Sequence, residues 1–216
     1  MLGEFFIIKR RISNLLKDKF NPDDLVLDIG CGEKPYYHKN IDAKIVCADI
    51  KQSKKTHFIC DATSLPIKRS KFDGVVCVNS LYYYDNPFKS IKEFADILKK
   101  NGKLIIVTPF IYPIHDIPND KYRFTEYGIR ELLKNDFTVK EIKTVGGIFN
   151  LKSVFLHSLI KGIPMIAPKG FKTIAKFFTC ILLYPFYILV QLIEPLDFFD
   201  KSRRWPTYYF TVAIKN

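Results

Sequence analysis

Two aspartates and a pair of glycines stand at distances that suit the binding of a nucleotide-like ligand. Asp28 lies near the end of an apolar run that begins at Leu25, and Gly30 and Gly32 follow it with one residue between them. Glycines at such a turn let the backbone approach a ligand closely. Asp49 comes 21 residues after Asp28, a spacing at which an acid commonly accepts hydrogen bonds from both ribose hydroxyls. These residues predict the ligand class without naming the ligand.

A proline stands where a dinucleotide-binding sequence has its third glycine. The pattern G-x-G-x-x-G would require glycine at position 35, and this chain has Pro35 there. Proline suits the first turn of a short helix instead. The sequence therefore argues against a nicotinamide-dependent dehydrogenase.

A second group of reactive side chains follows the apolar run 103–108. His115, Asp116, Asp120, Tyr122 and Arg123 fall within one short segment. Ligands of open α/β sheets bind at the carboxyl ends of the strands, so this segment is expected at the site. A histidine or an aspartate there is suited to removing a proton from a substrate hydroxyl. A structural alternative is that Asp120 and Arg123 pair with each other and fix the loop.

Alternating apolar runs and helical patterns must position these side chains. Asn86-Pro87 is expected to begin a helix that Asn101-Gly102 ends, and Thr125 is expected to cap another helix. This alternation predicts a doubly wound α/β fold with a mostly parallel sheet. The seven expected strands are residues 25–29, 44–50, 57–60, 72–78, 103–108, 137–145 and 207–214.

Composition and charge limit the classes of partner and the compartment that suit the protein. The chain has 216 residues and a net charge of +12, and 9 of its 34 basic but only 3 of its 22 acidic residues lie in 146–216. A basic surface fits nucleic acid or anionic lipid. The five cysteines form no C-x-x-C pair, and no cysteine–histidine cluster has metal-ligand spacing. We therefore expect a reducing, cytoplasmic compartment and no metal.

Two segments extend beyond a minimal sheet domain. Residues 1–20 have apolar positions at 5, 8, 12, 15, 16 and 20, which predicts an amphipathic helix. Residues 146–206 form a hydrophobic, basic helical insertion whose stretch 177–193 has 17 residues without a charge. If residues 207–216 supply the last strand, this stretch does not cross a bilayer once. Interfacial membrane contact is the leading interpretation, and an apolar substrate lid, a dimer surface and a true span are the alternatives.

The sequence resembles the class I S-adenosylmethionine-dependent methyltransferases, in particular the UbiE-like (type 11) group. The resemblance covers about residues 22–145 and depends on the order and spacing of several short motifs. They are residues 26–32 (Val-Leu-Asp-Ile-Gly-Cys-Gly), Asp49, Asp61-Ala62, Leu65-Pro66, Phe72-Asp73 and residues 98–104. The resemblance implies one methyltransferase domain over 1–216, with a Rossmann-like sheet of seven strands. The last strand would be antiparallel, with the helical insertion before it.

The resemblance also implies roles for individual residues. S-adenosylmethionine is the expected cofactor, contacted by Asp28, Gly30, Cys31, Gly32, Asp49, Ile50, Asp61, Ala62, Asn79 and Ser80. Asp49 would hold the ribose, and Asp61 and Ala62 would bracket the adenine. The acceptor would meet Tyr36, Tyr82, His115, Asp120, Tyr122 and Arg123. His115 is the first candidate for the catalytic base and Asp116 the second.

The expected activity is O-methylation of a small-molecule or lipid-linked acceptor, such as a glycan or isoprenoid. The segment Asn79-Ser-Leu-Tyr replaces the Asn-Pro-Pro-Tyr type of tetrapeptide that many N-methylating enzymes carry, which favours an oxygen acceptor. Peripheral contact with an anionic membrane on its cytoplasmic face is expected, and a nucleic-acid partner is not. The alternatives are an RNA methyltransferase and a non-catalytic, cofactor-binding scaffold at the membrane. The oligomeric state and the acceptor's identity stay open.

Overall fold

The apolar run that begins at Leu25 forms the strand β1 (Leu25–Ile29) in the middle of the parallel part of the sheet. β1 lies between β2 (Lys44–Asp49) and β4 (Phe72–Val78), and both neighbours run parallel to it. Its side chains from Val26 to Ile29 are buried because helices cover both faces of the sheet. The computed structural model describes residues 6–199, 202 and 204–216.

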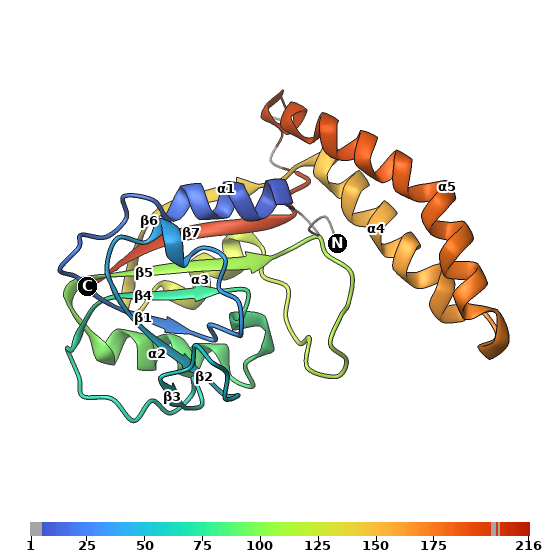
Figure 1. Ribbon diagram of the computed structural model, residues 1–216. Coiled ribbons are helices and arrows are strands. Elements are labelled where there is room, and N and C mark those ends of the chain that lie inside the picture. The colour runs from blue at the N-terminus through green and yellow to red at the C-terminus, as the bar shows by residue number, and fades with distance from the viewer. Residues whose placement is uncertain (1–5, 200–201, 203) are drawn as a thin grey trace.

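Seven strands form one sheet in the order β3-β2-β1-β4-β5-β7-β6 (Figure 1). The strands not yet introduced are β3 (Phe58–Ile59), β5 (Leu98–Pro109), β6 (Phe137–Val145) and β7 (Tyr208–Lys215), and β3 and β6 form the two edges of the sheet. β7 lies between β5 and β6 and is antiparallel to both, whereas the other pairs are parallel. The predicted Rossmann-like fold, with its antiparallel last strand, is confirmed.

Helices cover the two faces of the sheet and create a core on each. α1 (Phe6–Leu16) buries Ile8, Ile12 and Leu16 against one face. α2 (Pro87–Ile97) and α3 (Glu126–Leu133) pack on the other face. The structure describes the predicted amphipathic helix of residues 1–20 from residue 6 onward. Its apolar position 5 lies outside the described residues.

The two predicted helix caps are present, but one helix ends earlier than the sequence suggested. Asn86 Oδ1 accepts a hydrogen bond from the backbone N–H of Lys89 at 3.0 Å, and Thr125 Oγ1 accepts one from Gly128 at 3.0 Å. α2 ends at Ile97, and β5 already begins at Leu98. Leu98 is fully buried and pairs with Phe72, so packing at the sheet overrides the Asn-Gly signal three residues later.

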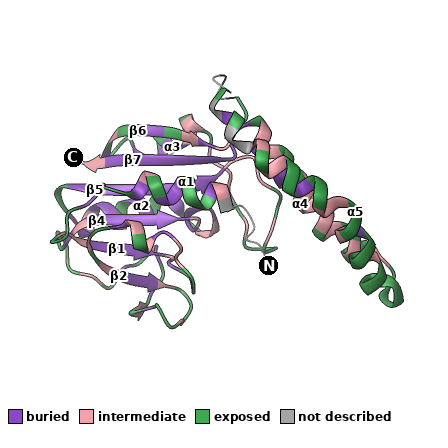
Figure 2. Cartoon of the chain, turned by 45° about the horizontal axis from the view of Figure 1, so that its top comes forward, coloured by how far each residue is buried: buried purple, intermediate pink, exposed green. Residues whose placement is uncertain are grey.

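The insertion forms a helical hairpin that extends away from the sheet (Figures 1 and 2). It consists of α4 (Ile148–Ile166), the 3-10 turn η3 (Lys169–Phe171), α5 (Lys172–Ile193) and the 3-10 helix η4 (Glu194–Phe199). The buried carboxylate of Asp197 fixes its base, because it accepts hydrogen bonds from the amides of Gly147 and Phe149 at 2.9 and 2.8 Å. The chain then returns to the sheet as β7. The proposed boundaries at 20, 146 and 206 stay predictions.

Candidate functional site

The two glycines after β1 have left-handed backbone conformations but different surroundings. Gly30 has φ +75° and Gly32 has φ +63°. A Cβ atom on Gly30 would lie 2.4 Å from Cβ of Ser80, whereas one on Gly32 would meet nothing within 4 Å. Gly30 is therefore required for packing against the end of β4. Gly32 leaves its backbone open to a ligand.

These surroundings predict unequal effects of alanine at the two glycines. We expect Gly30→Ala to lower the free energy of unfolding by about 2–4 kcal/mol, because overpacking adds to the backbone strain. Gly32→Ala introduces the backbone strain alone and should cost about 1 kcal/mol. Urea unfolding of both variants and the wild type measures the difference. Equal losses at the two positions would contradict the packing described for Gly30 and Ser80.

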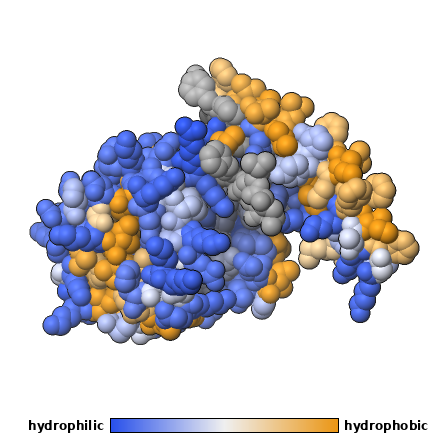
Figure 3. All heavy atoms as spheres, viewed as in Figure 1, coloured by the Kyte–Doolittle hydropathy of each residue, from blue (hydrophilic) through white to orange (hydrophobic). Residues whose placement is uncertain are grey.

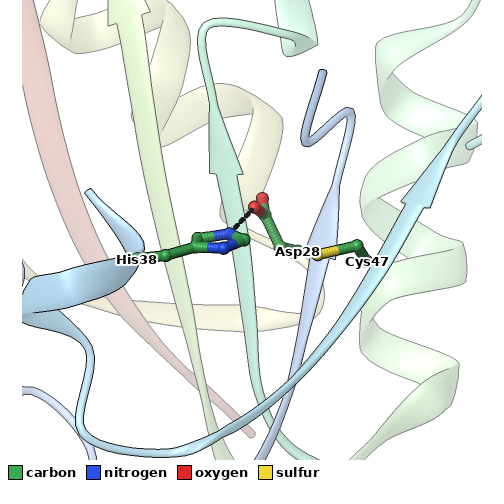
Figure 4. Close-up of side chains that lie close together, drawn as sticks. All are labelled: Asp28, His38 and Cys47. Carbon is green, nitrogen blue, oxygen red and sulfur yellow. Dashed lines mark hydrogen bonds and ion pairs between the residues drawn. The ribbon is translucent and has the colours of Figure 1, made fainter. Parts of the chain in front are cut away.

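Asp28 is completely buried, and two side chains of the following segment bind it, of which Figure 4 shows His38. Tyr37 donates its hydroxyl hydrogen to the carboxylate, with O–O distances of 3.0 and 2.9 Å, and His38 Nε2 lies 2.6 Å from Oδ2. Burial raises the pKa of Asp28, and the hydrogen bond from His38 opposes that rise. Asp28 thus ties the segment after the glycine turn to β1. Tyr37 and His38 carry no motif signal, so the sequence did not identify them.

Asp28 and His38 also belong to a group of three potential metal ligands. Ligand atoms of Asp28, His38 and Cys47 lie within 4.8 Å of one another. Asp28 Oδ2 and His38 Nε2 are nevertheless in direct contact with each other, which satisfies both atoms. The sequence-based expectation of no metal stays a prediction.

The residues that were predicted to bind the ribose and the adenine lie together at the carboxyl ends of β1, β2 and β3. Asp49 Oδ2 accepts a hydrogen bond from the amide of Gly32 at 2.9 Å, and Oδ1 accepts one from Lys51 at 2.9 Å. Ile50 beside it is 68% exposed. Asp61 is exposed after β3. The acidic groups and the apolar side chain of Ile50 thus share one accessible edge of the sheet.

The neighbouring small residues are buried beneath that edge. Ala62 and Cys31 are both buried. Their side chains therefore support the loops from below. Any contact of these two residues with a ligand at this edge stays a prediction.

Asn79 and Ser80 follow β4, but their side chains have different environments. Asn79 has φ +56°, and its buried Oδ1 has no hydrogen-bond partner among the described residues. Ser80 was predicted to face the ligands, but its buried hydroxyl donates to the carbonyl oxygen of Ile29 at 2.9 Å. Ser80 thus supports the glycine turn from below, because Gly30 lacks the side chain that would otherwise occupy this space. Asn79 alone of the two offers a free polar atom.

A cavity of about 180 Å³ lies next to Asn79 and is rich in aromatic side chains. It combines α1 with the carboxyl ends of β4 and β5 and with the start of β7. Its lining residues are Ile8, Lys9, Ile12, Tyr36, Asn79, Tyr82, Pro109, Tyr112, His115 and Tyr208. A larger hollow of about 560 Å³ between α1 and β6 contains none of the predicted site residues. The smaller cavity is therefore the candidate acceptor site.

His115 lies between a carboxylate and a tyrosine hydroxyl. Its Nδ1 is 3.1 Å from Asp120 Oδ2 and 3.1 Å from the carbonyl oxygen of Pro113, and its Nε2 is 3.2 Å from the hydroxyl of Tyr82. Both partners of Nδ1 are acceptors, so this network assigns the ring proton to Nδ1. Nε2 then carries the lone pair on the side of Tyr82. The arrangement is suited to general-base chemistry.

Asp120 and Arg123 form the ion pair that holds this loop. Arg123 Nη2 donates to Asp120 Oδ2 at 2.6 Å, and Nη1 donates to Oδ1. The guanidinium lowers the pKa of the Asp120 carboxyl. It also lies 5.5 Å from the ring centroid of Tyr82. The structural alternative considered for these two residues is thus present, and it fixes both His115 and Tyr82.

Two other residues of the predicted site point elsewhere. Asp116 is exposed and accepts a hydrogen bond from the hydroxyl of Tyr83 at 2.6 Å. Tyr122 donates to the carbonyl oxygen of Asp85 at 3.2 Å and stacks on Phe124. Neither residue lines the cavity, and Arg123 does not line it either. Conversely, Tyr112, Tyr208 and the α1 residues were missed, because no motif connects these distant segments.

The depressed pKa of Asp120 predicts a pH-dependent contribution to stability. We expect Asp120→Asn to lower the free energy of unfolding by about 2 kcal/mol at pH 7, because it removes the charge partner of Arg123. A carboxyl with a lowered pKa stabilises the fold fully above its unfolded value of about 3.9. That stabilisation is lost as the pH falls below this value. Urea unfolding of both proteins should show a gap that shrinks between pH 5 and pH 3, whereas a constant gap would contradict the charge pairing.

Comparison with known proteins shows which proteins this chain resembles. Residues 27–106 match the family model described as a methyltransferase domain. An uncharacterised protein of Methanocaldococcus jannaschii is 38% identical over 109 residues, which cover 47% of this chain and 48% of that protein. A tRNA U34 carboxymethyltransferase of Campylobacter fetus is 28% identical over 106 residues, covering 41% of this chain and 38% of the relative. The matches thus span less than half of each of these two relatives.

Solved structures share the whole fold at low sequence identity. Phosphoethanolamine N-methyltransferase 2 of Haemonchus contortus, in complex with S-adenosyl-L-methionine, has a TM-score of 0.59 at 15% identity. The similarity covers 97% of this chain and 52% of that one. A methyltransferase of Haloferax volcanii, in complex with the activator Trm112, has a TM-score of 0.57 at 14% identity and covers 96% of this chain and 88% of that one. These likenesses concern the fold.

Proposed function

Because this chain belongs to the class I S-adenosylmethionine-dependent methyltransferases, we propose that it methylates a hydroxyl group of an acceptor bound in the aromatic cavity. S-adenosylmethionine is the cofactor of this family. The observation that carries the proposal is the chain of contacts from Asp120 through His115 to the hydroxyl of Tyr82 at the cavity wall. It supplies a base where an acceptor hydroxyl needs one.

The residues at the sheet edge fit the proposed cofactor. Gly32 leaves its backbone open, and the carboxylate of Asp49 lies at the end of β2. Ile50 exposes an apolar side chain suited to cover a base. The buried Oδ1 of Asn79 has no partner among the described residues and is an acceptor suited to an ammonium group. A ligand with a ribose, a base and an ammonium group would therefore meet complementary groups here.

The protein's share in catalysis is to position the acceptor and to remove its proton. The cofactor supplies an activated methyl group for an in-line displacement. His115 Nε2 would take the proton of the acceptor hydroxyl as its oxygen attacks. Asp120 would stabilise the resulting imidazolium, and Arg123 holds that carboxylate in place. The aromatic walls would exclude water and fix the acceptor.

The cavity lining indicates the class of acceptor. Four tyrosine rings and two isoleucines suit an acceptor with a flat or apolar body and one polar end. We propose a small-molecule or lipid-linked acceptor, such as a glycan or an isoprenoid, methylated at the cytoplasmic face of a membrane. RNA methylation is the second candidate, favoured by the similarity to tRNA U34 carboxymethyltransferases and by the net charge of +12.

The experiment supplies methyl-tritiated S-adenosylmethionine to the purified protein together with either total lipid or bulk tRNA of the source organism. We expect label in the organic-extractable fraction that resists mild alkali, as a methyl ether does. Label in tRNA would establish the second candidate. Cofactor binding by calorimetry without label in either fraction would favour the non-catalytic scaffold, and no binding would contradict the assignment of the cofactor site.

A further inference from the structure

The α4–α5 hairpin has an inverted distribution of polarity. The side of each helix that faces the other one carries polar residues. The rings of His157 on α4 and Tyr187 on α5 lie 5.7 Å apart across the two helices, and the buried residues of α5, Thr179 and Tyr187, are both polar. On α4, Asn150, Ser153 and Val154 are buried near the base of the hairpin. On α5, Thr179, Tyr187 and Gln191 follow one another at multiples of four residues and so share one face.

The outward sides of the hairpin are apolar. Figure 3 shows hydrophobic surface along the arm that projects from the sheet domain. The exposed residues of α5 include Ile174, Phe177, Phe178, Ile181, Leu182, Phe186, Ile188, Leu189 and Leu192. On α4 they include Phe155, Leu159, Ile163, Met165 and Ile166. Soluble monomers rarely expose a large contiguous apolar surface, and such surfaces mark sites of contact with a protein or a membrane.

This distribution of polar and apolar side chains indicates whether lipid or water surrounds the hairpin. In water, two helices associate by burying apolar side chains between them. Within lipid, small and polar side chains between helices are favoured, because lipid chains already surround apolar ones. The helical segment 169–193 also contains an 18-residue stretch with a mean hydropathy of 1.8, and 11% of that stretch is buried. The hairpin therefore follows the rule for lipid.

Charge specifies the kind of lipid. From residue 146 to residue 193 the sequence has five lysines and no acidic residue. Lys161, Lys169, Lys172 and Lys176 are exposed on both sides of the turn η3, which joins α4 to α5. Figure 1 shows that this turn lies at the end of the hairpin distant from the sheet. Lysines at such positions attract anionic head groups and keep the charged end at the membrane surface.

The path of the chain decides how the hairpin meets the bilayer. α4 begins directly after β6, and β7 pairs with β5 and β6 after α5. Both ends of the hairpin therefore lie on the side of the sheet. We propose that the α4–α5 hairpin embeds its outer apolar face in the interface of an anionic bilayer. Because both of its ends lie on one side, the hairpin does not make a single crossing of the bilayer. The proposal concerns membrane binding and holds independently of methyl transfer.

Vesicle flotation with the full chain tests this proposal. We expect the wild type to float with vesicles of phosphatidylcholine and phosphatidylglycerol (3:1) and less with phosphatidylcholine alone. Phe177→Ser combined with Phe178→Ser should lower the bound fraction at least tenfold. Phe88→Ser is the matched control, because Phe88 on α2 is 61% exposed, as is Phe177. Replacing Lys169, Lys172 and Lys176 with glutamine should weaken binding to the anionic vesicles and reduce its salt dependence.

Circular dichroism and calorimetric binding of S-adenosylhomocysteine show whether each variant keeps its fold. Equal flotation of the wild type and the phenylalanine variant would overturn the proposal. A lipid-free dimer that the same two substitutions dissociate, together with no flotation of the wild type, would also overturn it in favour of a second copy. Flotation without methyl transfer would leave membrane binding intact and count only against the enzymatic function.

Discussion

Replacing His115 with alanine is expected to slow methyl transfer by about 10²–10⁴-fold, the usual contribution of a general base. The substitution removes Nε2, which lies 3.2 Å from the hydroxyl of Tyr82 at the cavity wall. It leaves the glycine turn and Asp49 intact, so the affinity for S-adenosylmethionine should change less than twofold. Single-turnover rates with a labelled methyl group and calorimetry measure the two quantities separately.

Two further variants separate the chemical role of His115 from its packing. His115→Gln retains much of the volume and hydrogen-bonding capacity but lacks a basic nitrogen, so it should be as slow as alanine. Tyr127→Phe, an exposed change on α3, should retain the wild-type rate. If the glutamine variant keeps most of the activity, His115 positions the loop and is not the base.

Replacing Asp49 with alanine is expected to weaken S-adenosylmethionine binding by about 100-fold or more. Two hydrogen bonds from ribose hydroxyls to a carboxylate contribute about 1.5 kcal/mol each at the lower end of their range, and 1.4 kcal/mol corresponds to tenfold. The lower end applies because the side chain is half-exposed. Isothermal titration calorimetry measures the dissociation constant directly.

The same change also removes the acceptor for the amides of Gly32 and Lys51. Some of the loss would therefore come from a less ordered turn, and urea unfolding shows how much. Asp23→Ala, which breaks an exposed contact with Lys44, is the control and should bind normally. Wild-type affinity in Asp49→Ala would mean that the ribose is held elsewhere.

The sequence carried most of the information about the sheet. Apolar runs such as 25–29 and 72–78 form buried parallel strands, because such runs have few alternatives when helices cover both faces. Caps at Asn86 and Thr125 are local hydrogen bonds and follow from local sequence. Leu98 was assigned to a helix but begins β5, because a tertiary contact with Phe72 decides its conformation.

The sequence carried less information about the candidate site. His115, Asp120 and Arg123 lie close in the chain, so their contact was foreseeable from one segment. The cavity also needs Lys9 from α1 and Tyr208 from β7, which no local pattern connects. The direction of Ser80 followed from the missing side chain of Gly30, a property of packing in three dimensions. Side-chain direction in loops is set by such neighbours and not by spacing.

The position of β7 has a consequence for how the protein is made. β7 fills the place between β5 and β6, yet it is synthesised after the hairpin. Until β7 arrives, the edges of β5 and β6 are unpaired while the apolar hairpin is already available. Long-range pairing of this kind is slow to form. A nascent chain near a bilayer would bury the hairpin first and complete its sheet afterwards, whereas one far from lipid would expose both surfaces together and be prone to aggregation.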